Sequence, residues 1–213
     1  MRLILAAAAL AALTATPALS ASFTTFTDRA AFEAAVGAGL TVETFDSVLV
    51  DTSFGGGGSA TVGAVTMSAT LDIGGYNMID APSVTAEVNV NGTTALNVGT
   101  LGSDTATMSF ASSIFAFGAD FFNFNDGVQR TRIEVGADVL LPPVTPSYTP
   151  TFFGFISDAA FSSLQFTALQ SDAYGIDNVS FATATSDVPV PAAAPMLLAG
   201  IAGLGLLRRR ARG

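Results

Sequence analysis

The chain contains no cysteine, no histidine, no tryptophan and no lysine. Without cysteine it cannot form disulfides. Without histidine it has no Ser-His-Asp triad, no His-ligated zinc site and no imidazole base. The absence of tryptophan removes the largest aromatic platform for a sugar ring. Chemistry that uses only carboxylates, as in glycosidases, would need two of them facing each other across a cleft.

Positive charge is scarce outside the two ends of the chain. Between residues 21 and 187 there are only three arginines, at positions 29, 130 and 132, against 17 carboxylates. Such an acidic surface repels nucleic acid and anionic lipid headgroups. It suits a soluble exported protein, a hydrated extracellular matrix or the binding of divalent cations, and it argues against a nucleic-acid partner.

The first 20 residues have the pattern of a secretory signal peptide. Arg2 is followed by an apolar stretch over residues 3–13, Pro17 interrupts it, and small residues follow. We expect cleavage after Ser20, with cleavage after Ala21 as the alternative.

The other end of the chain has three parts in a fixed order. Residues 188–192 read Val-Pro-Val-Pro-Ala, residues 192–207 are apolar, and an arginine cluster follows. The apolar run is about 24 Å long as a helix, which is enough to span a bilayer with local thinning or snorkelling arginines. We therefore expect a transmembrane segment at 192–207 with its arginines in the cytoplasm and residues 21–186 outside the inner membrane.

This segment resembles the VPLPA-CTERM variant of the PEP-CTERM sorting domain. The residues that carry the resemblance are Val188, Pro189, Val190, Pro191, Ala192, Arg208, Arg209 and Arg210. Val190 stands where the variant usually has leucine. The resemblance implies a Gram-negative envelope protein that an exosortase-type membrane protease cuts near the Pro motif and passes toward the cell surface or the exopolysaccharide matrix.

The part between the two signals, residues 21–186, predicts an all-β domain with one short helix. Thr27 is a candidate cap, residues 28–36 favour a helix, and Gly37 would end it. Short β-type runs separated by turn residues follow, which is typical of an antiparallel sandwich and predicts a jelly-roll-like one. The predicted strands cover residues 41–45, 60–69, 83–88, 95–98, 105–110, 114–122, 131–135, 151–156, 163–168 and 177–183, with 114–121 as a central strand.

Oxygen-bearing side chains cluster in the segment Asp120-Phe-Phe-Asn123-Phe-Asn125-Asp126-Gly127. Oxygen ligands at alternating positions suit calcium, but the spacing is not that of an EF-hand. Asn-Asp-Gly after a strand also favours a turn, because these residues tolerate a left-handed backbone. The turn is the favoured interpretation.

The domain ends on Gly175-Ile-Asp177-Asn-Val-Ser-Phe181, which is similar to the last-strand motif of calcium-containing jelly-roll carbohydrate-binding modules. The resemblance implies that Asp177 ligates a structural calcium, with Glu43 or Asp46 from an early strand beside it. A buried carboxylate needs backbone donors, an arginine or a metal, so backbone hydrogen bonding of Asp177 is the alternative.

Tyr148, in the Pro-rich segment at residues 141–150, is the one tyrosine that we expect to be exposed and able to stack on a sugar ring. Together these features predict a non-enzymatic structural or adhesive protein of the envelope or exopolysaccharide, anchored in the inner membrane until it is cut. A calcium-stabilised carbohydrate-binding module is the alternative.

Overall fold

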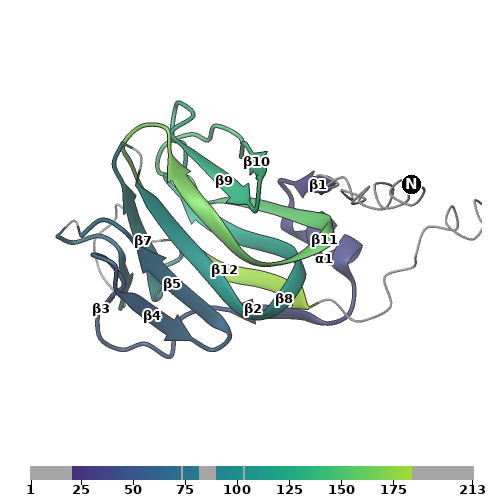
Figure 1. The fold of residues 1–213 in the computed structure, drawn as a ribbon, viewed down its shortest axis with the longest axis horizontal. Coiled ribbons are helices and arrows are strands. Elements are labelled where there is room, and N and C mark those ends of the chain that lie inside the picture. The colour runs from purple at the N-terminus through teal and green to yellow at the C-terminus, as the bar shows by residue number, and fades with distance from the viewer. Residues whose placement is uncertain (1–20, 73, 82–89, 103, 184–213) are drawn as a thin grey trace, which may run out of the picture.

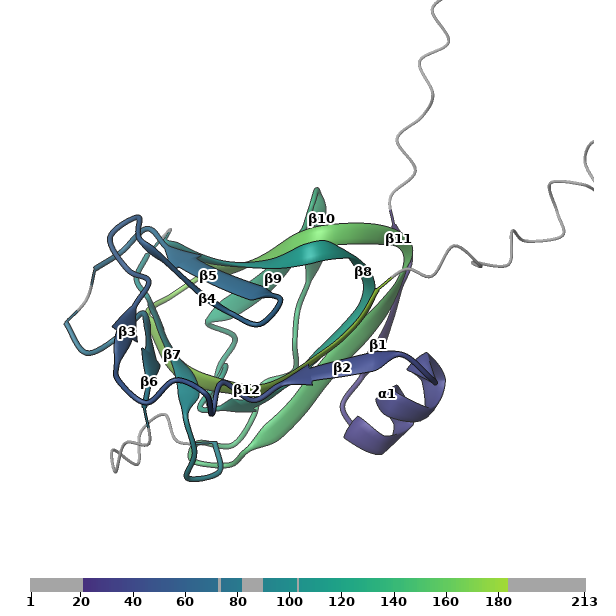
Figure 2. The same cartoon turned by 90° about the horizontal axis from the view of Figure 1, so that it is seen from below.

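The computed structural model describes residues 21–72, 74–81, 90–102 and 104–183. Within them twelve strands form one antiparallel sheet that folds back on itself into two layers, and one short helix lies outside it (Figures 1 and 2). The predicted all-β architecture with one helix near its start is therefore confirmed. The predicted signal peptide, the predicted strand at 83–88 and the C-terminal sorting segment lie outside the described residues. No helix in the described ranges has the length and apolar character needed to cross a membrane.

The elements in chain order are β1 (Phe23–Phe26), α1 (Arg29–Val36), β2 (Leu40–Glu43), β3 (Thr52–Ser53), β4 (Ser59–Val62), β5 (Val65–Ala69), β6 (Met78–Asp80), β7 (Ala95–Thr100), β8 (Thr105–Phe122), β9 (Thr131–Val135), β10 (Asp138–Leu140), β11 (Thr151–Ala168) and β12 (Asp172–Thr183).

Two strands of 18 residues each, β8 and β11, pair with each other and belong to both layers. Their paired segments 105–109 and 163–167 lie in the layer ordered β4-β5-β8-β11-β9-β10. Their other halves pair in the layer ordered β1-β11-β8-β12, where β7 and β2 continue from opposite halves of β12. The register between the strands shifts where they pass from one layer to the other.

The passage between the layers is marked by exposed residues. Residues 111–113 of β8 and 158–160 of β11 are exposed, while the segments on either side are largely buried. The sequence pattern predicts the end of a strand at each of these points, because small and polar residues interrupt the alternation of apolar side chains. The prediction of separate strands at 105–110 and 114–122, and at 151–156 and 163–168, is therefore wrong: each pair is one bent strand.

The space between the layers is filled by a core of aromatic and aliphatic side chains. Phe117 is fully buried there, and its ring centroid lies 5.6 Å from that of Phe155 and 6.4 Å from that of Phe110. Phe121 stacks on Phe124 with centroids 4.5 Å apart. Since β8 has β11 on one side and β12 on the other, the predicted central position of residues 114–121 is confirmed.

Helix α1 covers the outer face of the second layer. Its cap is Asp28, whose carboxylate accepts the amide of Ala31 at 2.7 Å, so the prediction that Thr27 caps the helix is wrong. Gly37 ends the helix with a φ of 74°, as predicted. Phe32 is buried, and Val36, one turn later on the same face, packs against the same cluster.

A glycine pair makes room for this helix. Gly118 of β8 and Gly154 of β11 lie opposite each other in the register. A Cβ atom on Gly118 would lie 2.7 Å from Cζ of Phe152 and 3.1 Å from Cε1 of Phe32. Glycine at this position thus lets two aromatic rings lie directly on the sheet.

Three other predicted boundaries differ from the structure. Residues 60–69 form a hairpin, β4 and β5, because Gly63 turns the chain with a φ of 54° between Val62 and Val65. The last strand begins at Asp172 rather than at 177. The early strand ends at Glu43, since Phe45 adopts a φ of 60°.

Replacing Phe117 by alanine should lower the free energy of unfolding by about 3–5 kcal/mol, because a large buried ring is lost and a cavity is left between two other rings. Chemical denaturation of the processed protein measures this. The exposed Ser112→Ala, on the same strand, should change stability by less than about 0.5 kcal/mol. An equal effect of the two substitutions would contradict the two-layer core.

Candidate functional site

An open pocket of about 370 Å³ lies at one end of the sandwich, where β7 and β8 end and β12 begins. Side chains from the loop after β8, the loop before β6 and the start of β12 meet there. Its lining residues are Tyr76, Gly99, Leu101, Asn123, Asp126, Arg130, Ser171, Asp172 and Ala173.

The loop after β8 owes its shape to residues that accept a left-handed backbone. Asn123, Asn125 and Gly127 have φ values of 59°, 53° and 69°. The buried Asn125 holds the loop to the next strand: its Oδ1 accepts the amides of Arg130 at 2.8 Å and Thr131 at 2.6 Å. The cluster noted in the sequence is therefore a turn, as favoured, and its Asp120 points elsewhere, to Arg29 on α1 at 2.9 Å.

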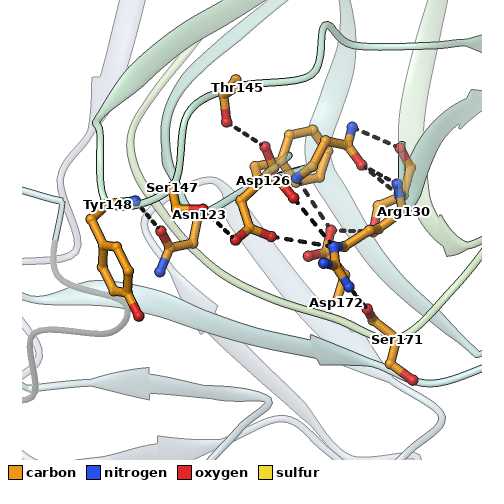
Figure 3. A network of polar contacts seen from close by, with 11 residues as sticks. Asn123, Asp126, Arg130, Thr145, Ser147, Tyr148, Ser171 and Asp172 are labelled. Carbon is orange, nitrogen blue, oxygen red and sulfur yellow. Dashed lines mark hydrogen bonds and ion pairs between the residues drawn. The ribbon is translucent and has the colours of Figure 1, made fainter. Parts of the chain in front are cut away.

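Charged and hydroxyl groups at the pocket are linked by an ion pair and hydrogen bonds (Figure 3). Arg130 forms an ion pair with Asp126, with Nε to Oδ1 at 3.2 Å, and donates to the carbonyl of Ser171 at 3.2 Å. Asp126 also accepts the hydroxyl of Ser147 at 2.8 Å. The guanidinium and the carboxylate are both partly exposed, so each keeps a solvent-facing edge.

Asp172 also lines the pocket and is 7% exposed. Its Oδ2 accepts the hydroxyl of Thr131 at 2.7 Å. Burial raises the pKa of this carboxyl and the charge of Asp126 raises it further, while the hydrogen bonds from Thr131 and Asn125 and the charge of Arg130 lower it. Two carboxylates thus line one pocket, and both are engaged in hydrogen bonds that hold the loop to the sheet.

Tyr148 is 68% exposed, as predicted. Its backbone has a φ of 58°, which is a strained conformation for a bulky residue. The side chain of Asn123 accepts the Tyr148 amide at 2.6 Å and so holds this geometry (Figure 3). The Tyr148 ring packs edge-on against Phe122, with centroids 6.3 Å apart. A fixed, exposed ring therefore stands next to a pocket-lining amide.

The sequence did not single out most of this pocket. Tyr76, Arg130 and Asp172 come from three separate segments, and no spacing rule connects them. The one available signal was the run of left-handed-tolerant residues from Asn123 to Gly127, which indicated a shaped turn after the central strand.

Asp177 lies on β12 in a second polar cluster and is fully buried. Its Oδ1 accepts the amide of Asn178 at 2.6 Å, and its Oδ2 accepts the hydroxyl of Thr93 at 3.4 Å. Burial raises the pKa of the carboxyl from 3.8 to about 6; the Asn178 amide lowers it, the charge of Asp46 raises it, and Thr93 and Asn91 lower it.

The two expected partners of Asp177 take different positions. Asp46 is near enough to raise the pKa of Asp177 by charge repulsion. Glu43 lies on β2 opposite Val179 of β12, and its Oε1 accepts the amide of Phe45 at 3.0 Å. The early strand that carries Glu43 therefore pairs with the last strand, which carries Asp177. In the described ranges no three acidic or histidine side chains form a metal-binding group.

The raised pKa of Asp177 gives a pH prediction. The unfolded carboxyl ionises at a lower pH than the folded one, so folding stability contributed by this group falls as pH rises from 3.8 to about 6. Asp177→Asn removes the titration. The stability of the variant relative to the unmodified protein should therefore rise across this window and level off above it. Denaturation series at several pH values in chelator test this, and a flat difference would contradict it.

No protein-family model matches the chain, and no curated protein matches it. A role for the protein is therefore argued from its own residues. The candidates are the two polar clusters described above, one around the pocket and one around Asp177.

Proposed function

We propose that this chain is an exported structural or adhesive protein of the cell envelope or the exopolysaccharide matrix, sorted by its C-terminal segment. The observation that supports the adhesive role is geometric: the pocket lies at the start of β12, and Thr183, the last described residue, lies at the other end of that strand. Export and sorting are supported by the signal-peptide pattern, the Pro motif, the apolar run and the terminal arginines.

The first and last described strands lie close together at one end. Across the second layer, Thr24 is opposite Ile156, Ile156 is opposite Ala116, and Ala116 is opposite Ala182. Three strand spacings separate Thr24 from Ala182, which is about 14 Å. The chain therefore enters and leaves the domain on the same side, where α1 also lies (Figures 1 and 2).

The pocket lies at the far end of the same strand. Asp172 begins β12 and lines the pocket, while Thr183 ends it toward the proposed anchor. From the first to the last of its twelve residues, β12 is at most about 36 Å long. A domain anchored at its C-terminus would thus present the pocket and Tyr148 away from the membrane, where a matrix polymer is found.

Routing is tested by changing the arginines. Replacing Arg208, Arg209 and Arg210 by serine should reduce membrane retention and alter cleavage near residues 188–192, because the tail loses the charges that hold it in the cytoplasm. Fractionation and mass spectrometry of the chain from an exosortase-containing Gram-negative host measure both. Asp72→Asn, which removes one exposed charge from the domain, is the control for altered charge. Unchanged retention and processing in the tail variant would refute the sorting proposal.

A second candidate function is that of a calcium-stabilised carbohydrate-binding module of the jelly-roll type. It is supported by the buried Asp177 beside Asp46, together with a pocket lined by tyrosine, amide, carboxylate and guanidinium groups. Planar polar side chains can pair with sugar hydroxyls, and an aromatic ring can cover the apolar face of a sugar. Calcium would offset the repulsion of the two carboxylates.

Binding to a panel of neutral and acidic bacterial exopolysaccharides tests the pocket. Tyr148→Ala should weaken binding about tenfold, which corresponds to about 1.4 kcal/mol for one stacked ring. Asp126→Asn should weaken it as well, by releasing Arg130 and Ser147. Leu141→Ala, an exposed change in the same Pro-rich loop, is the matched control. If neither Tyr148→Ala nor Asp126→Asn changes binding, this site is refuted, and release of reducing ends would indicate a carboxylate-based hydrolase instead.

Calcium is tested by thermal unfolding. In millimolar calcium the melting temperature should exceed that in chelator, by the equivalent of about 2.7 kcal/mol at a hundredfold excess over the dissociation constant. Asp177→Asn should abolish most of the difference, and Asp72→Asn, an exposed change elsewhere, should not. An identical melting temperature with calcium and chelator would leave Asp177 as a carboxylate that is satisfied by hydrogen bonds alone.

A further inference from the structure

The first two described residues are held by two aspartates from different strands. The backbone nitrogen of Ala21 donates to Oδ2 of Asp138 on β10 at 3.1 Å. The backbone nitrogen of Ser22 donates to Oδ1 of Asp158 on β11 at 2.8 Å, and the carbonyl of Ser22 accepts the amide of Asp158 at 3.1 Å. The Ser22–Asp158 contacts extend the pairing of β1 with β11 back to Ser22, and the Ala21 contact to β10 lies at the position where cleavage after Ser20 would create a new end.

We propose that Asp138 forms a receiving site for the mature N-terminus, in which it binds the α-ammonium group that cleavage after Ser20 creates on Ala21. The inference rests on the export proposed above. Hydrolysis of the Ser20–Ala21 peptide bond adds water and leaves a carboxylate on Ser20 and an ammonium on Ala21. The nitrogen that donates to Asp138 as a neutral amide before cleavage then donates as a cation, and charge-assisted hydrogen bonds are about twice as strong as neutral ones.

The place of this contact in the fold gives it a structural consequence. β1 is the edge strand of one layer and β10 is the edge strand of the other. The bond from Ala21 to Asp138 therefore joins the two layers along one open side of the sandwich. An edge strand that is tied down in this way is less available for pairing with another chain.

The charges around the site favour a new cation there. The backbone nitrogens of Ala21 and Ser22 donate to the carboxylates of Asp138 and Asp158. On β9, next to β10, Arg132 and Glu134 pair with each other at 2.6 Å. The other two arginines of the domain pair with Asp120 and Asp126. The α-ammonium would thus be a fourth positive charge in an acidic domain that contains three arginines.

The absence of lysine makes the test selective, because the α-amine is the only primary amine in the processed chain. The full chain is exported and processed in a Gram-negative host, purified in detergent, and reductively methylated with ¹³C-formaldehyde. NMR titration then reports the pKa of that single amine. The reference is a peptide with the sequence of residues 21–24, methylated in the same way.

We expect the pKa in the protein to exceed that of the peptide by at least about half a unit, since ordinary α-amino groups titrate at about 7.7–8.0 and a carboxylate stabilises the cation. Asp138→Asn should remove most of the shift, whereas Asp72→Asn should leave it intact. The folded pKa lies above the unfolded one, so the stabilisation is present near neutral pH and is lost as pH rises through the folded value. The melting temperature of the free-amine protein should therefore exceed that of an N-acetylated sample at pH 7, and the difference should disappear above about pH 10.

The outcomes separate the two proposals. Mass spectrometry that finds Met1 retained in the exported fraction would refute export by a cleaved signal. A mature chain that begins at Ala21 with the pKa of the peptide would overturn the receiving site and leave export intact. A chain that begins at Ser22 would also overturn it, because the ammonium would then lie beside Asp158. If Asp138→Asn does not fold, the pKa of the amine in the unmodified protein compared with that in the peptide still decides whether the receiving site exists.

Discussion

The pairing of β8 with β11 is the constraint on which the rest of the structure depends. Both strands run through both layers, so they fix how the layers lie over each other and where the aromatic core forms. The other paired strands of the described chain join this pair directly or through β5, β9, β12, β7 or β6. The glycine pair on these two strands also decides where α1 can pack, since only a bare backbone admits Phe32 and Phe152.

Scarce positive charge shapes the polar architecture. Each arginine of the described chain makes polar contacts within the domain. Arg29 holds α1 to β8 and β12, Arg130 closes the loop beside the pocket, and Arg132 forms an ion pair with Glu134 on the same strand, β9. With three arginines for many carboxylates, several of these groups accept hydrogen bonds from backbone amides and hydroxyls instead. This explains why Asp172 and Asp177, both buried, accept from neutral donors and have raised pKa values. It is also the physical basis for proposing an ammonium at Asp138 and a cation at Asp177.

The sequence predicted the candidate sites unevenly. Burial of Asp177 followed from its apolar neighbours, and exposure of Tyr148 followed from its Pro-rich loop; the structure confirms both. The pocket could not be predicted, because Tyr76, Arg130 and Asp172 approach one another only through the meeting of three loops. Nor could the contact of Ala21 with Asp138, which lie 117 positions apart.

The sequence by itself determined the all-β class, the position of the helix, the central strand at 114–121 and the turn after it. These follow from local rules: period-two alternation, helix-forming and helix-ending residues, and side chains that tolerate a left-handed backbone. Only the tertiary structure decided that four predicted strands are two long ones, that residues 60–69 form a hairpin, and which loops share a pocket. Continuity of β8 and β11 depends on hydrogen bonds to partners far along the chain, and those bonds persist where the local pattern of apolar residues is interrupted.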